Sequence, residues 1–130
     1  MDRILIVSPD NHRLADFAAV LASSGFEVAW EGSGEKALER AKQIRPMLVI
    51  LDEHLEDMTA WEAIQRLLAI DATINTGVVS KLDPEKFHAR SEGLGVMACI
   101  PFCPTKLSAT EVIEALKRIS RLNLPDSVRP

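Results

Sequence analysis

The sequence predicts an α/β fold in which one parallel sheet of five strands is covered by helices on both faces. Short apolar runs alternate with segments of helical period along the chain. The run from Met47 to Leu51 has no polar residue, which is typical of a parallel strand buried on both faces. With 130 residues, the chain has the length of one domain, large enough to bury a core without disulfides or metals.

Five apolar runs are predicted to be the strands of this sheet. They cover Arg3 to Val7, Glu27 to Trp30, Met47 to Leu51, Thr76 to Ser80 and Val96 to Ile100. A helical segment lies between each pair, and such crossovers join parallel strands. Five strands in five repeats predict a flavodoxin-like, doubly wound sheet of order 2-1-3-4-5.

The first three helices are predicted from apolar residues three and four positions apart, which form one buried face. These residues are Leu14, Phe17, Ala18 and Leu21 in the first helix, Ala37, Leu38 and Ala41 in the second, and Ile64, Leu67 and Leu68 in the third.

The last two helices are predicted from their end signals. Asp83-Pro84 is an N-cap followed by a first-turn proline, and Gly93 ends a short, polar fourth helix. Ser108 and Glu111 have the spacing of a capping box, which predicts the start of the fifth helix. We expect residues 1–122 to form the domain and residues 123–130 to be a tail or linker stub, because prolines there cannot continue the helix.

Composition excludes several classes of function. The chain has a net charge of −4, and its basic residues are interspersed with acids, so we expect no nucleic-acid surface. No apolar run is long enough to span a bilayer and no signal peptide precedes the first strand, so we expect a cytoplasmic protein without membrane contact. The spacing of Cys99 and Cys103 fits neither a redox pair nor a zinc knuckle, and we expect reduced thiols, one buried in a strand.

Asp52 is the first candidate for chemistry. It follows the third predicted strand, and ligands of open α/β sheets bind outside the carboxyl ends of the strands. The first strand is followed by Ser8 and Pro9, and the nearest acid beyond it is Asp10. Asp10 is suited at least as well to capping the first helix as to binding a ligand.

These motifs resemble the receiver domains of two-component response regulators over nearly the whole chain. Ile4 to Val7 is similar to the first strand of that family, and Gly34 to Leu38 to the start of its second helix. Glu92-Gly93-Leu94 and Ile100-Pro101-Phe102 resemble the Ala-Gly-Ala and Lys-Pro-Phe signposts of receivers, in which the peptide bond before the proline is often cis.

The resemblance also implies roles for individual residues. Asp52 corresponds to the aspartate that accepts a phosphoryl group from a sensor histidine kinase, and Ser80 to the hydroxyl residue that turns toward this group. A Mg²⁺ ion would be bound by Asp10, Asp52 and the backbone carbonyl of His54.

The chain departs from the receiver pattern at the positions that supply charge. Ser8 and Pro9 replace the metal-binding acids, and Ile100 replaces the lysine that pairs with the phosphoryl group. The aromatic switch residue is replaced by Met97. Acids near Asp52, namely Glu53, Glu56 and Asp57, are expected to disfavour its phosphorylation by like-charge repulsion. We therefore expect weak Mg²⁺ binding and a degenerate receiver, or pseudo-receiver.

The function predicted from this pattern is signalling by protein–protein contact, without enzymatic activity. The contact face is formed by the fourth helix, the fifth strand and the fifth helix, and it would bind a histidine kinase, another signalling protein or a second copy of the chain. Its predicted residues are Phe87, His88, Arg90, Glu92, Glu114, Lys117 and Arg118.

Two alternatives stay open at this point. The chain is a conventional receiver phosphorylated on Asp52 if Asp10 supplies a metal ligand and Lys81 or Lys106 replaces the missing lysine. The weaker alternative is a flavodoxin-like domain that binds a small molecule, although the loops lack a glycine-rich phosphate cradle.

Overall fold

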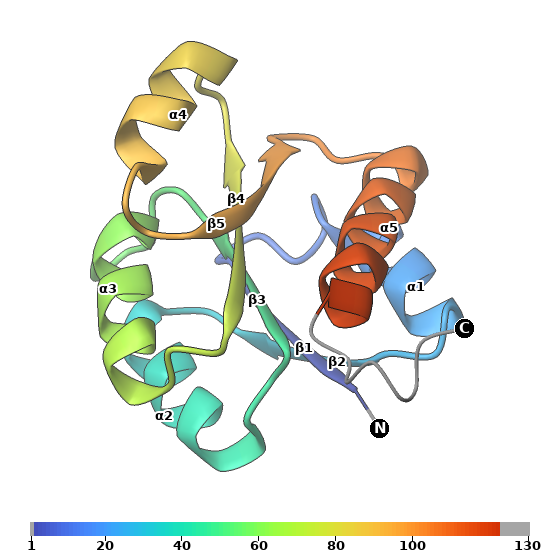
Figure 1. Ribbon diagram of the computed structural model, residues 1–130, viewed down its shortest axis with the longest axis horizontal. Helices are drawn as coiled ribbons and strands as arrows, with labels where there is room; N and C mark the ends of the chain where they lie inside the picture. Colours follow the sequence, from blue (N-terminus) through green and yellow to red (C-terminus); the bar gives the residue numbers. More distant parts are fainter. Residues whose placement is uncertain (1, 123–130) are drawn as a thin grey trace.

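The computed structural model describes residues 2–122, over which strands and helices alternate strictly (Figure 1). The elements are β1 (Arg3–Val7), α1 (Ala15–Ser23), β2 (Glu27–Glu31), α2 (Gly34–Ile44), β3 (Leu48–Asp52), α3 (Ala60–Ile70), β4 (Asn75–Ser80), α4 (Pro84–Ser91), β5 (Val96–Pro101) and α5 (Lys106–Leu122). All strand pairs are parallel, and the order is β2-β1-β3-β4-β5. The predicted fold class is confirmed, while the predicted tail at 123–130 lies outside the described residues.

Helices cover both faces of the sheet. α2, α3 and α4 lie on one face, and α1 and α5 lie on the other (Figure 1). Side chains alternate along each strand between the two faces, so Leu5 and Val49 pack in the first layer and Ile4 and Ile50 in the second. Two apolar cores result, one on each side of the sheet.

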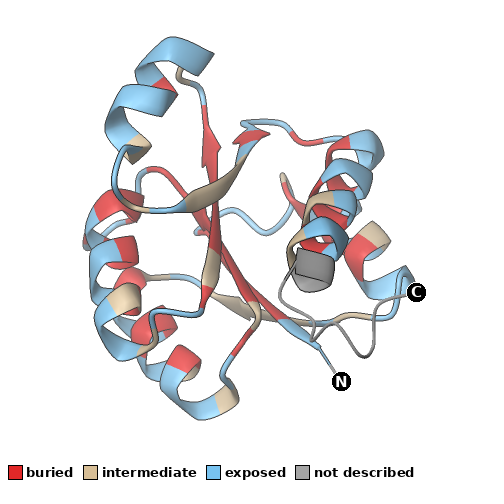
Figure 2. Cartoon of the chain, viewed as in Figure 1, coloured by how far each residue is buried: buried red, intermediate tan, exposed pale blue. Residues whose placement is uncertain are grey.

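β3 is buried along its whole length, at the centre of the sheet (Figure 2). This burial agrees with its uninterrupted apolar sequence. Asp52 is the last residue of β3 and lies opposite Val79 of β4 in the register. A charged residue is therefore held at the edge of the core, where the carboxyl ends of the strands meet.

The start of α5 corrects the predicted capping box. The helix begins at Lys106, and the reciprocal bonds join Thr105 and Ser108. The Thr105 amide donates to the Ser108 hydroxyl at 3.1 Å, and the Ser108 amide donates to the Thr105 hydroxyl at 3.3 Å. Because Ser108 is already the third residue of the helix, the predicted pairing of Ser108 with Glu111 is wrong.

Three further predictions are wrong: a buried cysteine, an exposed Phe87 and a cis peptide bond before Pro101. Cys99 is exposed, as is Cys103, because β5 is an edge strand of the sheet and is only partly covered. Phe87 is buried, with its ring in an edge-to-face contact with that of Trp61 at 5.6 Å, so it does not belong to an exposed contact face. No peptide bond of the described residues is cis, so the cis bond expected before Pro101 is absent.

None of the helices in the described part of the chain combines the length and the apolar character that crossing a membrane requires.

Candidate functional site

A cleft of about 440 Å³ lies at the carboxyl ends of the strands. It brings together residues that the sequence separates widely, because the loops after β1, β3, β4 and β5 meet at one edge of a parallel sheet. The lining residues are Pro9, Asp10, Arg13, Asp52, Glu53, His54, Val79, Ser80, Lys81, Leu82 and Phe102.

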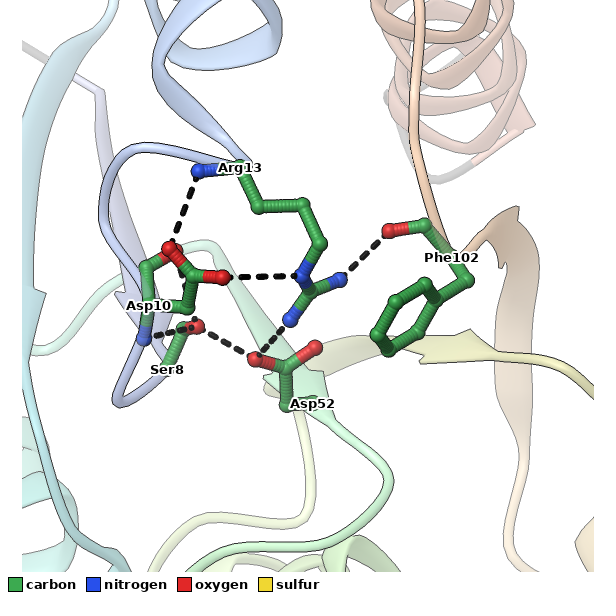
Figure 3. A network of polar contacts seen from close by, with 5 residues as sticks. All are labelled: Ser8, Asp10, Arg13, Asp52 and Phe102. Carbon is green, nitrogen blue, oxygen red and sulfur yellow. Dashed lines mark hydrogen bonds and ion pairs between the residues drawn. The ribbon is translucent and has the colours of Figure 1, made fainter.

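Asp52 is 4% exposed and already has a cationic partner (Figure 3). Its Oδ2 atom lies 2.6 Å from Nη2 of Arg13 and also accepts a short hydrogen bond from the hydroxyl of Ser8. Its Oδ1 atom is buried and has no hydrogen-bond partner within residues 2–122. One carboxylate oxygen is therefore neutralised from within the protein, and the other is shielded.

Arg13 joins three segments of the chain. Besides the ion pair with Asp52, its Nη1 atom donates to the backbone carbonyl of Phe102 at 2.5 Å, and its guanidinium lies 3.9 Å from the centre of the Phe102 ring. Its Nε atom lies 3.5 Å from Oδ2 of Asp10. The planar guanidinium carries donors on several sides, so one side chain can bond to Asp52 and Phe102 at once, while Nε faces the Asp10 carboxylate as an ion pair without a hydrogen bond (Figure 3).

The loop between β1 and α1 holds Arg13 in this position. The hydroxyl of Ser8, which is 1% exposed, accepts a hydrogen bond from the Asp10 amide at 3.0 Å. The Asp10 carboxylate in turn accepts from the Arg13 amide at 3.1 Å. Asp10 thus caps the turn before α1 and not, as the sequence had suggested, the helix itself, because the N-cap residue of α1 is Leu14, which has no side-chain cap. Its carboxylate faces Arg13.

Ser80 points to Glu53. Its hydroxyl donates to Oε1 of Glu53 at 2.6 Å and accepts from the Leu82 amide at 2.9 Å. Glu53 is 9% exposed, and its other oxygen lies 3.9 Å from Nε2 of His54, whose side chain is open to solvent. The side chain that resembles the receiver switch hydroxyl is therefore bonded to a neighbour of Asp52 and not to Asp52 itself.

Asp57 is turned away from the cleft and caps α2. Its carboxylate accepts hydrogen bonds from the backbone amides of Gly34 at 2.9 Å and Glu35 at 3.0 Å. These bonds, first from Glu35 and then from Gly34, lower the pKa of the Asp57 carboxyl below its usual value. Asp57 and Glu56 do not line the cleft, so of the three expected repulsive acids only Glu53 is at the site.

The positions of the possible replacement cations differ. The Nζ atom of Lys81 lies 4.1 Å from the centre of the Phe102 ring and lines the cleft. Lys106 is the first residue of α5 and is not part of the lining. Ile100 is 1% exposed and packs with α1 and α5, and Met97 is partly buried against the same core. Lys81 is therefore the better placed of the two lysines.

The donor set does not fit a Mg²⁺ site. Mg²⁺ prefers octahedral oxygen ligands with carboxylates among them. Ser8 offers a hydroxyl that is already bonded to Asp52, Pro9 has no side-chain donor, and Arg13 places a positive charge on Asp52. Across residues 2–122, no three His, Cys, Asp or Glu side chains converge in a way that would hold a metal ion.

Comparisons with known proteins agree with this fold. No protein-family model matches the chain. The chain is 27% identical over 122 residues to the chemotaxis protein CheY of Thermotoga maritima, covering 92% of this chain and 98% of that protein. It is 33% identical over 78 residues to the transcriptional regulatory protein PrrA of Mycobacterium tuberculosis, covering 60% of this chain and 34% of that protein.

Solved structures give the same result. The chemotaxis response regulator CheY4 of Vibrio cholerae has a TM-score of 0.78 and 16% identity, and covers 88% of this chain and 97% of its own. A two-component response regulator from Clostridium difficile has a TM-score of 0.80 and 14% identity, and the match covers 92% of this chain and 98% of that one. The fold is therefore that of response-regulator receivers. Similarity in sequence along most of the chain supports, more narrowly, a CheY-like receiver domain.

Arg13 is the site residue that the sequence did not reveal. An arginine in the first turn before a helix is usually solvated, and nothing in its local sequence points to Asp52 or Phe102, which lie 39 and 89 residues away. The sequence pointed to such a residue only indirectly. Because the metal-binding acids and the lysine of receivers are absent, a buried Asp52 needs a cation from another part of the chain.

Proposed function

We propose that this chain is a receiver domain of two-component signalling that works as a pseudo-receiver, by protein–protein contact and without enzymatic activity of its own. The observation that carries the proposal is the ion pair between Arg13 and Asp52, in a site where Ser8 and Pro9 replace the metal-binding acids.

Phosphoryl transfer to a carboxylate needs an accessible oxygen and cations that neutralise the phosphoryl oxygens. Oδ2 of Asp52 is engaged by Arg13 and Ser8, and Oδ1 is buried. Ile100 supplies no charge. These features support slow or absent phosphorylation of Asp52, and they support weak binding of Mg²⁺.

The proposed contact surface is formed by α4, β5 and α5. Phe87 is left out because it is buried. The other predicted residues of this surface are all exposed and charged or titratable: His88, Arg90, Glu92, Glu114, Lys117 and Arg118. Both signs of charge are present, so partner choice would depend on electrostatic complementarity more than on apolar burial. A histidine kinase, another signalling protein or a second copy of the chain would bind here.

A second candidate is a conventional receiver that is phosphorylated on Asp52. One observation favours it: the ammonium group of Lys81 lies at the cleft, where a lysine could pair with a phosphoryl group. Under this alternative, Arg13 would leave Asp52 before phosphorylation.

The two candidates are separated by intact mass spectrometry after incubation with acetyl phosphate and Mg²⁺, with Asp52→Ala as the matched control and a conventional receiver as the positive control. The pseudo-receiver predicts no adduct, also after short incubation times, and no complex with beryllofluoride. A single phosphoryl adduct in the wild type that is absent from Asp52→Ala would reject it in favour of the conventional receiver.

The contact proposal needs its own experiment. Light scattering over a concentration series detects self-association, and binding to the catalytic and histidine-bearing domains of kinases can be measured with Arg118→Glu and Arg90→Glu variants. Weakening by these variants, but not by Arg66→Glu on α3, is expected. Equal affinity in all variants would argue against this face.

A further inference from the structure

We propose that Arg13 is an internal counter-ion with two roles: it excludes a divalent cation from Asp52, and it fixes the position of the Phe102 loop between β5 and α5. The inference rests on the proposed function, since it explains how a receiver site can hold one arrangement without a phosphoryl group or a metal ion.

The first role follows from charge. Nη2 of Arg13 lies 2.6 Å from Oδ2 of Asp52, and the two side chains are only 11% and 6% exposed. Charges that are close and poorly solvated interact much more strongly than charges in water. A metal ion approaching Asp52 would meet the positive guanidinium first, so Arg13 would have to leave before the metal could bind.

The second role follows from the contacts to Phe102. Arg13 donates to the carbonyl of this residue at 2.5 Å and lies against its ring at 3.9 Å. The ring is 37% exposed and belongs to neither apolar core. The cations of Arg13 and Lys81 both lie over this ring, at 3.9 Å and 4.1 Å from its centre, so they contribute to holding the loop.

The loop after β1 is arranged to support both roles. Ser8 donates a hydrogen bond to the same oxygen of Asp52 that Arg13 binds, and its hydroxyl also accepts a hydrogen bond from the Asp10 amide. Asp10 accepts from the Arg13 amide and pairs with Nε. The replacement of metal-binding acids by Ser8-Pro9 and the presence of Arg13 therefore form one connected arrangement (Figure 3).

Lysine at position 13 would separate the two roles. The guanidinium uses Nη1 for Phe102 and Nη2 for Asp52, on a rigid plane. An ammonium group is a single point charge, which can stay beside Asp52 but cannot also reproduce the bond and the planar contact to Phe102. Arg13→Lys should keep the exclusion of the cation and lose the position of the loop.

The test uses the full chain with the variants Arg13→Gln and Arg13→Lys. The matched control is Arg66→Gln, which removes an exposed arginine that pairs with Glu35. Binding of Mg²⁺ is measured by calorimetry, and amide exchange of residues 102–106 by hydrogen–deuterium mass spectrometry. Arg13→Gln should raise Mg²⁺ affinity and loop exchange at least about tenfold. Arg13→Lys should raise exchange similarly but leave the affinity within about threefold of wild type.

Unchanged affinity in Arg13→Gln would overturn the first role, and unchanged loop exchange in both variants would overturn the second. If circular dichroism shows that Arg13→Gln is unfolded, Arg13→Lys alone carries the loop test, because it loses the bond and the planar contact to Phe102 while keeping a positive charge beside Asp52. A phosphoryl adduct on the wild type would reject the pseudo-receiver function without changing either of these readouts, so the two failures are distinguishable.

Discussion

Nη2 of Arg13 and Oδ2 of Asp52 lie 2.6 Å apart, although 39 residues separate them in the chain. The pair joins the segment that leads into α1 to the carboxyl end of the central strand β3. Both side chains are largely buried. Neither group can therefore be removed without leaving the other in a poorly solvated position, and the stability of the domain should depend on the pair as a unit.

Replacing Arg13 by Gln is expected to lower the free energy of unfolding by about 3 kcal/mol, because the carboxylate of Asp52 stays buried without its cation. The double variant with Asp52→Asn should lose less than the sum of the two single variants, with a coupling of about 1 to 3 kcal/mol. Urea denaturation at neutral pH measures all four proteins of the cycle. Additive losses would show that the two side chains act independently.

The Asp57 carboxylate gives a pH-dependent contribution to stability. Its pKa in the folded protein is lowered from 3.8 by the bonds from the amides of Glu35 and Gly34. The unfolded chain therefore takes up the proton first, and the stabilisation is present above about pH 4 and is lost as the pH falls through the lower folded value. Asp57→Asn should thus be less stable than wild type at pH 7, with a difference that shrinks below about pH 4.

Urea midpoints at pH 7, 5, 4 and 3 measure this difference. The neighbouring exposed Glu56 provides the control, because Glu56→Gln removes a charge without removing a helix cap. If the difference in urea midpoint between wild type and Asp57→Asn stays constant down to pH 3, the ionised carboxylate does not have this role.

The start of α5 can be tested with two alanine substitutions. Thr105→Ala removes the hydroxyl that caps the helix and should cost about 1 kcal/mol of unfolding free energy. Glu111→Ala changes an exposed residue and should stay within about 0.5 kcal/mol of wild type. The opposite order of the two effects in thermal or chemical denaturation would favour a capping box at Ser108 and Glu111.

The sequence predicted the fold and the place of Asp52 because both depend on local signals. An apolar run followed by a carboxylate is visible without knowledge of the rest of the chain. The ion pair of Arg13, the bond of Ser80 to Glu53 and the capping of α2 by Asp57 were not predicted, because they join residues from different loops. The partners of these side chains depend on how the loops meet at the edge of the sheet. The spacing of residues in the sequence does not show which loops meet.

The last prediction concerns Ile100, which occupies the position of the receiver lysine. Its side chain is 1% exposed and packs in the core between the sheet, α1 and α5. Ile100→Lys would have to bury an amine or bend its stem toward the cleft, where Arg13 already carries the positive charge. We expect a loss of about 2 to 4 kcal/mol in unfolding free energy, against less than about 1.5 kcal/mol for the control Ile100→Met.

We also expect Ile100→Lys to give no phosphoryl adduct with acetyl phosphate and Mg²⁺, because the lysine alone supplies neither the missing metal ligands nor an accessible oxygen on Asp52. Urea denaturation and intact mass spectrometry test the two parts separately. Efficient labelling of Asp52 in this single variant would mean that the lysine is the one missing component, and that Arg13 does not shield the carboxylate.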